Sequence, residues 1–164
     1  MTNQEFIHCD DNNTNLTLHD CIAEKVYLRN GKLVFEFPDG FEILPEHPDN
    51  PYNKLMVTDA AKVEFTLIDD YKSVCGVQAR VFVQEREKNR KRTVKCWDAD
   101  LFIKTINSKK CAYEFIYHYL NTQNPFNNVI YGYLHGEGKY SFCECWLEIY
   151  AKKVNYYWNN IIPY

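Results

Sequence analysis

Three residue types that can do chemistry stand side by side at His19, Asp20 and Cys21. An imidazole, a carboxylate and a thiol together could bind a transition metal or activate a nucleophile. Neighbouring residues of a strand point to opposite faces, so these side chains can meet one ligand only where the chain bends. We therefore interpret the segment as a lead-in to the first regular strand, in which the Asp or the His bonds backbone groups.

A metal ion at this segment would need further ligands from elsewhere in the chain. His47, His118 and His135 could supply them. Their positions do not follow the short ligand spacings of metal-binding sequences. We expect no metal site and no cofactor.

Glu114 and His118 form a second candidate for chemistry. Four positions apart, they would share one face of either a helix or a strand, and such a pair can act in general acid–base catalysis. No nucleophile or third group accompanies them, and the chain lacks the GxGxxG, P-loop, HExxH and GxSxG motifs. We predict a surface pair, and a protein that is not an enzyme.

The chain contains seven cysteines, at positions Cys9, Cys21, Cys75, Cys96, Cys111, Cys143 and Cys145. An odd number at irregular spacings, without a CxxC pair, predicts reduced thiols in a cytosol. Cys143 and Cys145 would share one face of a strand with Leu147 and Ile149. This phase predicts that both thiols pack as small core side chains.

A cluster of basic residues occupies one predicted hairpin tip, at Arg86, Lys88, Arg90, Lys91 and Arg92. Phe82 and Trp97 could lie near it, and cations beside stacking rings are typical of nucleic-acid binding. Glu85 and Glu87 interrupt the cluster, however, and a solvated turn is commonly charged. We interpret the cluster as a solvated tip; for a functional patch, an acidic protein would be favoured over nucleic acid.

The densest predicted aromatic patch lies towards the C-terminus. It combines Trp146 and Glu148 with Tyr156, Tyr157 and Trp158 on the neighbouring predicted strand. Large rings beside acids on an exposed sheet face are typical of protein interfaces, and also of sugar-binding platforms. The same rings could instead pack under a helix. We predict that these five residues contact one protein partner.

Composition limits the classes of partner. The formal net charge is −3 over 164 residues, which gives no general attraction to nucleic acid or to anionic membranes. The polar start of the chain lacks the apolar core of a signal peptide, and no stretch has the length of a membrane helix. We expect a cytoplasmic protein that binds neither nucleic acid nor membrane, and the oligomeric state stays open.

A polar–apolar alternation of period two recurs along most of the chain and predicts antiparallel strands. Residues 1–17 lack this period and are expected to form a flexible arm ahead of a single β-rich domain at 18–164. Strands are predicted at 21–28, 32–37, 41–43, 62–68, 77–87, 93–97, 129–135, 141–152 and 154–158. Asn30-Gly31 and Asp39-Gly40 predict tight turns between the first three, and Lys152-Lys153 predicts the last turn.

One short helix is predicted between two strands. Asp98 is a suitable N-cap, and Asn107 can close the helix in a left-handed conformation. Residues 111–120 fit either a helix or a strand, and their aromatic density favours a strand. Residues 121–128, around Pro125, are predicted to form a loop.

Three segments carry a resemblance to known proteins: Leu18-His19-Asp20-Cys21, the run from Asn30 to Phe37, and Asp39-Gly40-Phe41. Together they resemble the openings of small uncharacterised bacterial proteins, some of which look like immunity proteins encoded beside polymorphic toxins. The resemblance covers the first quarter of the chain and carries no catalytic residue. It implies a cytosolic, non-enzymatic protein that binds a partner and, as an immunity protein, would occlude a toxin.

These observations predict a mainly β protein, an antiparallel, partly closed barrel or sandwich of about nine or ten strands with one short α-helix. Protein binding is the first hypothesis for its function. The alternatives are a small-ligand-binding β-barrel, whose apolar cavity Phe and Tyr would line, and an enzyme without a recognisable motif. A filled interior would distinguish the first from the second, and perturbed pKa values in a cleft would favour the third.

Overall fold

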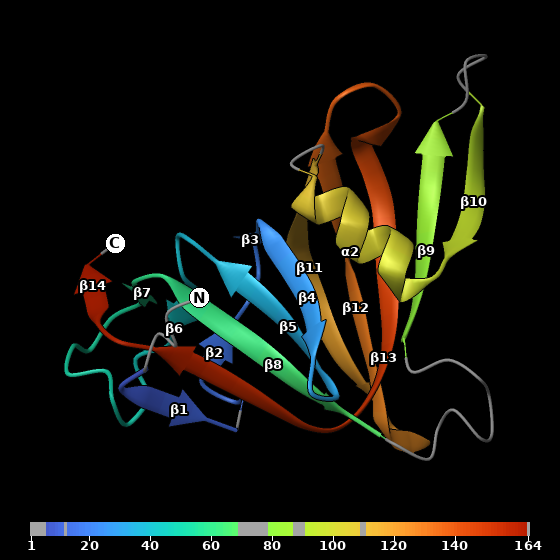
Figure 1. The fold of residues 1–164 in the computed structure, drawn as a ribbon. Coiled ribbons are helices and arrows are strands. Elements are labelled where there is room, and N and C mark those ends of the chain that lie inside the picture. The colour runs from blue at the N-terminus through green and yellow to red at the C-terminus, as the bar shows by residue number, and fades with distance from the viewer. Residues whose placement is uncertain (1–5, 12, 69–78, 87–90, 109–110, 164) are drawn as a thin grey trace.

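The computed structural model describes residues 6–11, 13–68, 79–86, 91–108 and 111–163. These residues form antiparallel β-sheets with one α-helix (Figure 1), so the predicted mainly β class is confirmed. The largest sheet bends into two layers that form a partly closed sandwich, and the described strands do not close into a barrel. Fourteen strands are described, more than the nine or ten predicted, because several are very short.

The two layers are named here the first and the second sheet. The first sheet contains, in spatial order, β10 (Arg92–Trp97), β9 (Ala79–Arg86), the first part of β13 (Ser141–Trp158), β12 (Asn124–Gly136), β11 (Cys111–Asn121) and β3 (Cys21–Ala23). The second sheet contains β1 (His8–Asp10), the last part of β13, β8 (Ala61–Leu67), β5 (Lys32–Phe37) and β4 (Lys25–Arg29). A separate small sheet contains β14 (Ile161–Pro163), β7 (Met56–Thr58), β6 (Glu42–Ile43) and β2 (Leu16–Thr17), and a 3-10 turn, η1 (Gly138–Tyr140), precedes β13.

Strand β13 joins the two sheets over 18 residues. Its first part pairs with β12 and β9, its last part pairs with β8, and the register shifts between Ala151 and Lys153. An extra residue of this kind bends a strand without ending it. The turn predicted at Lys152-Lys153 is therefore wrong: both lysines are exposed at a bend in one continuous strand.

The tight turn at Asn30-Gly31 is confirmed between β4 and β5. Both residues have positive φ angles, 51° and 71°, which matches the strand twist of a two-residue hairpin. Gly40 also has a positive φ, of 75°, and a Cβ atom there would lie 2.3 Å from the carbonyl oxygen of Thr58. Only glycine fits at this second turn.

Aromatic rings fill the space between the two sheets. Phe35 lies edge-to-face to Phe65 and to Phe115, with ring centroids 5.8 and 5.2 Å apart. Tyr113 packs in the same way on Phe102 of the helix, at 5.6 Å. All five side chains are buried, and such pairs are the preferred arrangement of packed rings. The interior at this level is a packed core.

Helix α2 (Ala99–Asn107) covers the inner side of the first sheet next to β4 (Figure 1). Asp98 is its N-cap, as predicted, and accepts a hydrogen bond from the backbone N–H of Leu101 at 2.7 Å. The left-handed closure predicted at Asn107 is wrong. Its side chain instead bonds both backbone groups of Val26 on β4, at 3.0 and 2.6 Å, and Ser108 follows with a φ of −75°. Within the described residues, no helix has the length and apolarity to cross a membrane.

The structure also corrects the predicted N-terminal arm. In the described part of residues 1–17, β1 pairs with the end of β13 and Leu16 is buried. Short strands that pair far along the chain leave no periodic signal, which explains the error.

The segment at 111–120 is a strand, as favoured, but the loop predicted at 121–128 is wrong. Strand β12 begins at Asn124 after a two-residue turn. The side-chain oxygens of Asn121 and Asn124 accept hydrogen bonds from the backbone N–H groups of Gln123 and Phe126, which tightens this turn. Cys75 and the predicted start of a strand at 77 lie outside the described residues.

Candidate functional site

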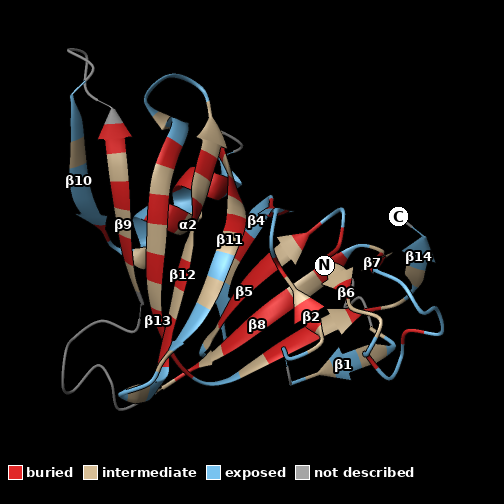
Figure 2. Ribbon diagram, turned by 180° about the vertical axis from the view of Figure 1, so that it is seen from behind, coloured by how far each residue is buried: buried red, intermediate tan, exposed pale blue. Residues whose placement is uncertain are grey.

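The outer face of the first sheet carries a set of exposed and half-buried rings, named here the aromatic face. Its members are Phe82 on β9, Phe142 and Trp146 on β13, Tyr131 and Tyr133 on β12, and Tyr117 and Tyr119 on β11. Figure 2 shows this side of the molecule, where no described element crosses the strands, and α2 lies behind them. Among the described elements, nothing therefore covers this face.

Strand register brings rings from four strands into one row. Phe82 lies opposite Trp146, Trp146 lies opposite Tyr131, and Tyr131 lies opposite Tyr117. The rings of Phe82 and Trp146 stack with centroids 5.2 Å apart and planes 13° apart, and those of Tyr117 and Tyr131 stack at 6.5 Å and 25°. Cross-strand contacts of this kind stabilise the sheet and hold the row in place.

A β-bulge places the rings of β11 on this face. The register shifts between Phe115 and Tyr117, so that Phe115 points into the core while Tyr117 and Tyr119 point outward and are 50% and 54% exposed. One extra residue changes the alternation at this point. Without the bulge, the same alternation would turn Tyr117 and Tyr119 inward with Phe115.

The orientation of the rings limits what the face can bind. Rings that stack on a neighbour turn their flat sides towards each other and present edges and hydroxyl groups to solvent. The hydroxyls of Tyr131 and Tyr133 lie 3.4 Å apart, and this hydrogen bond, followed by burial, raises the pKa of Tyr131. A platform for nucleobases needs open flat sides, whereas ring edges and hydroxyls suit a protein surface.

Two of the three acids on the aromatic face have a charged partner within the face. Glu114 contacts His135, with 2.5 Å between carboxylate oxygen and Nε2, and Glu144 lies 3.7 Å from the guanidinium of Arg92. The third acid, Glu148, lies opposite Arg80 of the neighbouring strand β9. Glu114 and Glu144 are therefore charge-compensated within the face.

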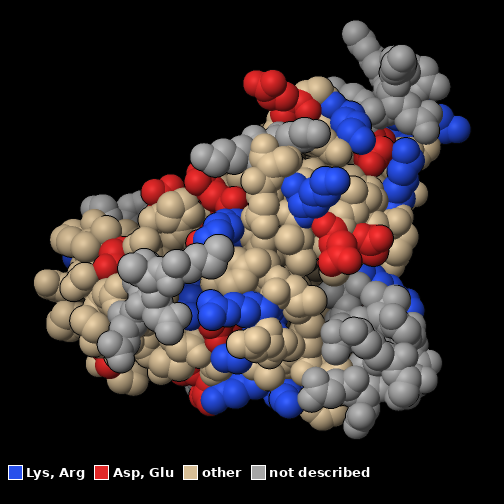
Figure 3. Space-filling model, viewed as in Figure 1, with Lys and Arg blue, Asp and Glu red and all other residues tan. Residues whose placement is uncertain are grey.

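The outer face of the second sheet has a different chemistry. Its side chains form ion pairs: Lys25 with Glu36 at 2.9 Å, and both Lys32 and Lys62 with Glu64 at 2.7 and 2.8 Å. Figure 3 shows basic side chains gathered over the middle of the molecule, where Figure 1 places β4, β5 and β8. This face is a solvated, charge-paired surface.

The five residues predicted to contact a partner do not form one patch. Trp146 and Glu148 lie on the aromatic face, but Tyr156 and Trp158 are only 2% and 0% exposed and belong to the core. Tyr157 lies on the outer face of the second sheet, with the ammonium of Lys62 4.4 Å above its ring. All five residues lie on β13, and the bend in that strand separates them. The prediction of a single patch is therefore wrong.

Sequence reasoning missed the contribution of β11 and β12 to the site. Tyr117, Tyr119, Tyr131 and Tyr133 are spaced two apart within each strand, which is a visible signal for one face. What brings them beside Trp146 is the pairing of β11, β12 and β13, which the sequence alone does not specify.

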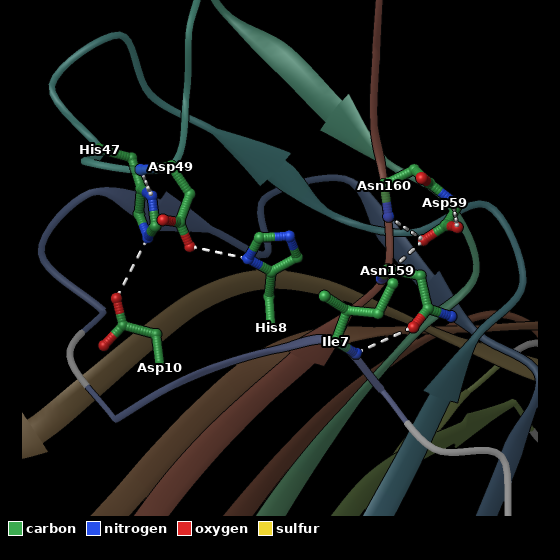
Figure 4. Close-up of polar contacts among 8 residues, drawn as sticks. All are labelled: Ile7, His8, Asp10, His47, Asp49, Asp59, Asn159 and Asn160. Carbon is green, nitrogen blue, oxygen red and sulfur yellow. Dashed lines mark hydrogen bonds and ion pairs between the residues drawn. The ribbon is translucent and has the colours of Figure 1, made fainter.

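A second polar cluster joins the N-terminal strand to the loop at 45–53 (Figure 4). The ring nitrogen Nδ1 of His47 accepts from the backbone N–H of Asp49 at 3.1 Å, so its Nε2 carries the proton and donates to Asp10 at 3.1 Å. His8 bonds the carboxylate of Asp49 at 2.9 Å and stacks on Trp158 at 5.3 Å. These contacts fasten β1 to the loop.

Asp59 fastens the C-terminal end in the same region (Figure 4). Its carboxylate accepts hydrogen bonds from the backbone N–H groups of Asn159 and Asn160, both at 3.1 Å, and from the Asn160 side chain at 2.8 Å. Although burial opposes the effect, these bonds lower the pKa of Asp59. Across the described residues, no three or more His, Cys, Asp or Glu side chains are grouped so that they could hold a metal ion.

The other residues singled out for chemistry are also kept apart. His19 and Asp20 form an exposed pair at 3.1 Å, whereas Cys21 is buried, and burial raises the pKa of its thiol to about 12. The predicted pair of Glu114 and His118 is wrong, because the bulge turns His118 inward. His118 donates from Nε2 to the side-chain oxygen of Asn128 at 3.0 Å, and burial lowers its pKa.

Six of the seven cysteines are described, and all six are free thiols. Cys143 and Cys145 are buried in the core with Leu147 and Ile149, as predicted. Burial raises the pKa of Cys111 to about 11 and that of Cys145 well above its ordinary value. These buried thiols stay protonated and unreactive.

The basic hairpin tip lies largely outside the described residues, including Lys88 and Arg90. Of the two rings expected near it, Phe82 belongs to the aromatic face. Trp97 is buried on the other side of the sheet, where its Nε1 donates to Glu85 at 3.2 Å. The two rings therefore form no joint stacking surface beside the basic residues.

A surface pocket of about 760 Å³ opens where β11 begins and β12 ends. Its lining includes Glu24, Glu137, Lys139 and His135, with the buried thiol of Cys111. The lining thus combines acidic and basic groups. This mixed charge favours no one class of ligand.

Comparisons with protein-family models, with characterised proteins and with solved structures find no match to this chain. The fold and the aromatic face therefore define the class: a β-sandwich with an open, ring-covered sheet face.

Proposed function

We propose that this protein is a non-enzymatic binding protein that contacts one protein partner through the aromatic face. The observation that carries the proposal is the row from Phe82 through Trp146 and Tyr131 to Tyr117. Strand pairing aligns it across four strands, and no described element covers it. Tyr and Trp supply large contact areas at low entropic cost and are enriched among residues that dominate binding energy.

Two features favour a protein over a sugar or a small apolar ligand. The rings of the row stack on one another and offer their edges and hydroxyls. The interior between the sheets, where a ligand-binding barrel would hold its ligand, is packed with Phe35, Phe65 and Phe115. The small-ligand alternative receives no support from this packing.

The first quarter of the chain resembles small uncharacterised bacterial proteins, some of which look like immunity proteins. This resemblance supports a toxin as the partner, whose active cleft the aromatic face would occlude. The free thiols support a reducing, cytosolic location. Both statements are part of the proposal.

The proposal is tested by affinity capture with tagged protein from the native cell lysate, followed by mass spectrometry. We expect one stoichiometric protein partner with the unchanged chain. Trp146→Ala and Tyr131→Ala should each lose it, because both remove a ring from the centre of the row. The matched control is Tyr157→Ala, which removes a half-buried ring of the same strand on the opposite sheet and should retain the partner.

Calorimetry with the purified partner then measures how much binding free energy each variant loses. Loss of a central ring should weaken binding by about 2 kcal/mol, or roughly 30-fold. Equal binding by Trp146→Ala and the unchanged chain would remove the aromatic face from the function. A small molecule released on denaturing the protein, with no captured partner, would favour the ligand-binding alternative.

A further inference from the structure

A surface pocket of about 270 Å³ lies between the segment that contains β2 and the middle of β11, and is named here the β11 pocket. Its walls include Leu16, Leu18, Phe115 and Tyr156, each of which is 7% exposed or less. None of the described residues that line it is Asp, Glu, Lys or Arg. Because burying a charge without a partner is costly, the β11 pocket favours an uncharged occupant.

His118 brings a hydrogen-bond acceptor to this pocket. The side-chain nitrogen of Asn128 donates to the carbonyl oxygens of Phe126 and Ile149, at 3.3 and 3.4 Å, so its side-chain oxygen is the group that faces His118. Nε2 of His118 donates to this oxygen at 3.0 Å and therefore holds the proton of the neutral ring. The other ring nitrogen, Nδ1, is left as an acceptor.

This acceptor has no partner among the described residues. In the described part of the chain, only Asn127, Asn155 and Trp158 carry side-chain nitrogen or oxygen atoms that are both enclosed and unpartnered, so Nδ1 of His118 remains accessible. The two nitrogens of an imidazole direct their bonds broadly away from each other. Asn128, the partner of Nε2, lines a neighbouring hollow and not the β11 pocket, which leaves Nδ1 on the side of the β11 pocket.

The β11 pocket adjoins the aromatic face through Tyr117. The ring of Tyr117 stacks on Tyr131 in the row of rings, and the same residue lines the pocket. At the rim, the ring of His19 meets Tyr117 edge-on, with centroids 5.9 Å apart. A partner that covers the row would therefore reach the pocket with a neighbouring side chain.

Size and chemistry together select that side chain. Pockets for drug-sized ligands begin at about 300 Å³, so the β11 pocket suits one large side chain. The residues that most often dominate binding energy from such pockets are Trp, Tyr and Arg, and the uncharged lining disfavours Arg. Tyr and Trp combine an apolar ring, which suits the walls, with an O–H or N–H donor, which suits Nδ1 of His118.

We infer that the β11 pocket receives a tyrosine or tryptophan side chain of the protein partner, which donates its O–H or N–H group to Nδ1 of His118. The inference rests on the proposed function, since it gives the same partner an anchor point beside the aromatic face. The ring would contact Leu16 and Leu18. The hydrogen bond to an otherwise unpartnered nitrogen would select these side chains over phenylalanine.

The test uses the full chain, labelled for nitrogen NMR, and three small probes at about pH 8, where the lowered pKa of His118 keeps its ring neutral. Para-cresol carries the phenol of tyrosine, para-methylanisole has the same ring and oxygen but no donor, and para-toluate is charged. We expect para-cresol to bind about tenfold tighter than para-methylanisole, and it alone should shift the nitrogen resonance of Nδ1. Para-toluate should bind more weakly than either.

Two variants assign the acceptor. His118→Phe keeps a ring and removes the acceptor, so it should bind para-cresol and para-methylanisole equally, with its fold checked by the same spectra. The control His19→Gln alters an exposed imidazole at the rim and should keep the preference for para-cresol. Equal binding of these two probes by the unchanged chain would overturn the inference. A preference that is lost in His19→Gln and kept in His118→Phe would overturn it as well.

Competition then distinguishes a side chain of the partner from a free small molecule. Saturating para-cresol should weaken binding of the captured partner about tenfold or more, because probe and anchor occupy the same pocket. Para-cresol that binds without weakening the partner would overturn the inference, in favour of a free ligand. The comparison of probes needs no partner, so its failure can be told apart from a failure of the aromatic-face test.

Discussion

Tyr113 and Gly132 fit together across β11 and β12 in the core of the first sheet. The hydroxyl of Tyr113 donates to the carbonyl oxygens of Ile130 and Cys145, at 3.3 and 3.2 Å. Gly132 provides the space, since a Cβ atom there would lie 2.9 Å from this hydroxyl and even closer to the carbonyl oxygen of Glu114. Core geometry at this point depends on a single missing methyl group.

Gly132→Ala should therefore destabilise the fold by about 2 to 3 kcal/mol, because the close atoms include backbone that cannot move aside. Urea unfolding measures the difference. The control is Gly138→Ala, where no atom lies within 4 Å and the cost should be about 1 kcal/mol, from the positive φ alone. Equal losses in the two variants would contradict the steric account.

His118 gives the protein a stability that depends on pH. Burial lowers its pKa below the ordinary 6.5, so the folded state binds the proton less readily than the unfolded state. The contribution of this pKa shift to the free energy of unfolding is fully present above about pH 6.5. It is lost as the pH falls from there towards the pKa of His118 in the folded state. Urea unfolding between about pH 8 and pH 5 measures this dependence. The free energy of unfolding should fall less steeply with decreasing pH for His118→Gln than for the unchanged chain.

The control for this experiment is His19→Gln, which alters an exposed imidazole. It should keep the full pH dependence of the unchanged chain. A pH profile altered by His19→Gln but not by His118→Gln would contradict the assignment.

At the scale of elements, α2 protects an edge of the second sheet through one side chain. Asn107 carries a donor and an acceptor in one amide group, and both reach Val26 on β4. The helix is therefore tied to the sheet by paired hydrogen bonds as well as by the buried side chains of Phe102 and Ile106. A backbone edge covered in this way is not available to another chain.

Asn107→Ala should reduce stability by about 1 to 2 kcal/mol, because two backbone groups of β4 lose their partners. Amide exchange at Val26 should accelerate more than at Phe35, its neighbour in β5. Lys104→Ala, at an exposed position of the same helix, serves as the control and should change neither quantity. Unchanged exchange at Val26 in Asn107→Ala would show that the edge is covered by other means.

The elements that the sequence predicts well are those governed by local chemistry. The turn at Asn30-Gly31, the N-cap at Asp98 and the core phase of Cys143 and Cys145 each depend on residues within a few positions. The bend of β13 and the pairing of β1 depend on contacts with distant strands. Three of the five predicted contact residues lie away from the aromatic face for this reason, since alternation assigns faces but not the point at which a strand changes sheets.

At the scale of the whole molecule, β13 divides its two tryptophans between surface and core. Trp146 lies before the bend on the aromatic face, and Trp158 lies after it, fully buried among Phe41, His47 and His8. One strand thus supplies both a ring of the aromatic face and a centre of the core.

The two tryptophans should differ in their effect on stability. Trp158→Ala should cost about 3 to 5 kcal/mol, the usual penalty for a large cavity in a core. Trp146→Ala should cost clearly less, because its ring is only partly buried. Thermal and urea unfolding of the two variants measures the difference, and a larger loss for Trp146→Ala would mean that the aromatic face is part of the core.

The measurement that tests the central claim most directly is hydroxyl-radical footprinting of side chains in the complex with the captured partner. If the aromatic face is the binding surface, oxidation of Trp146, Tyr117 and Tyr131 falls on binding, while that of Tyr157 and Tyr27 on the second sheet is unchanged. Protection of Tyr157 and Tyr27 with undiminished oxidation of Trp146 would place the partner on the opposite face and contradict the account.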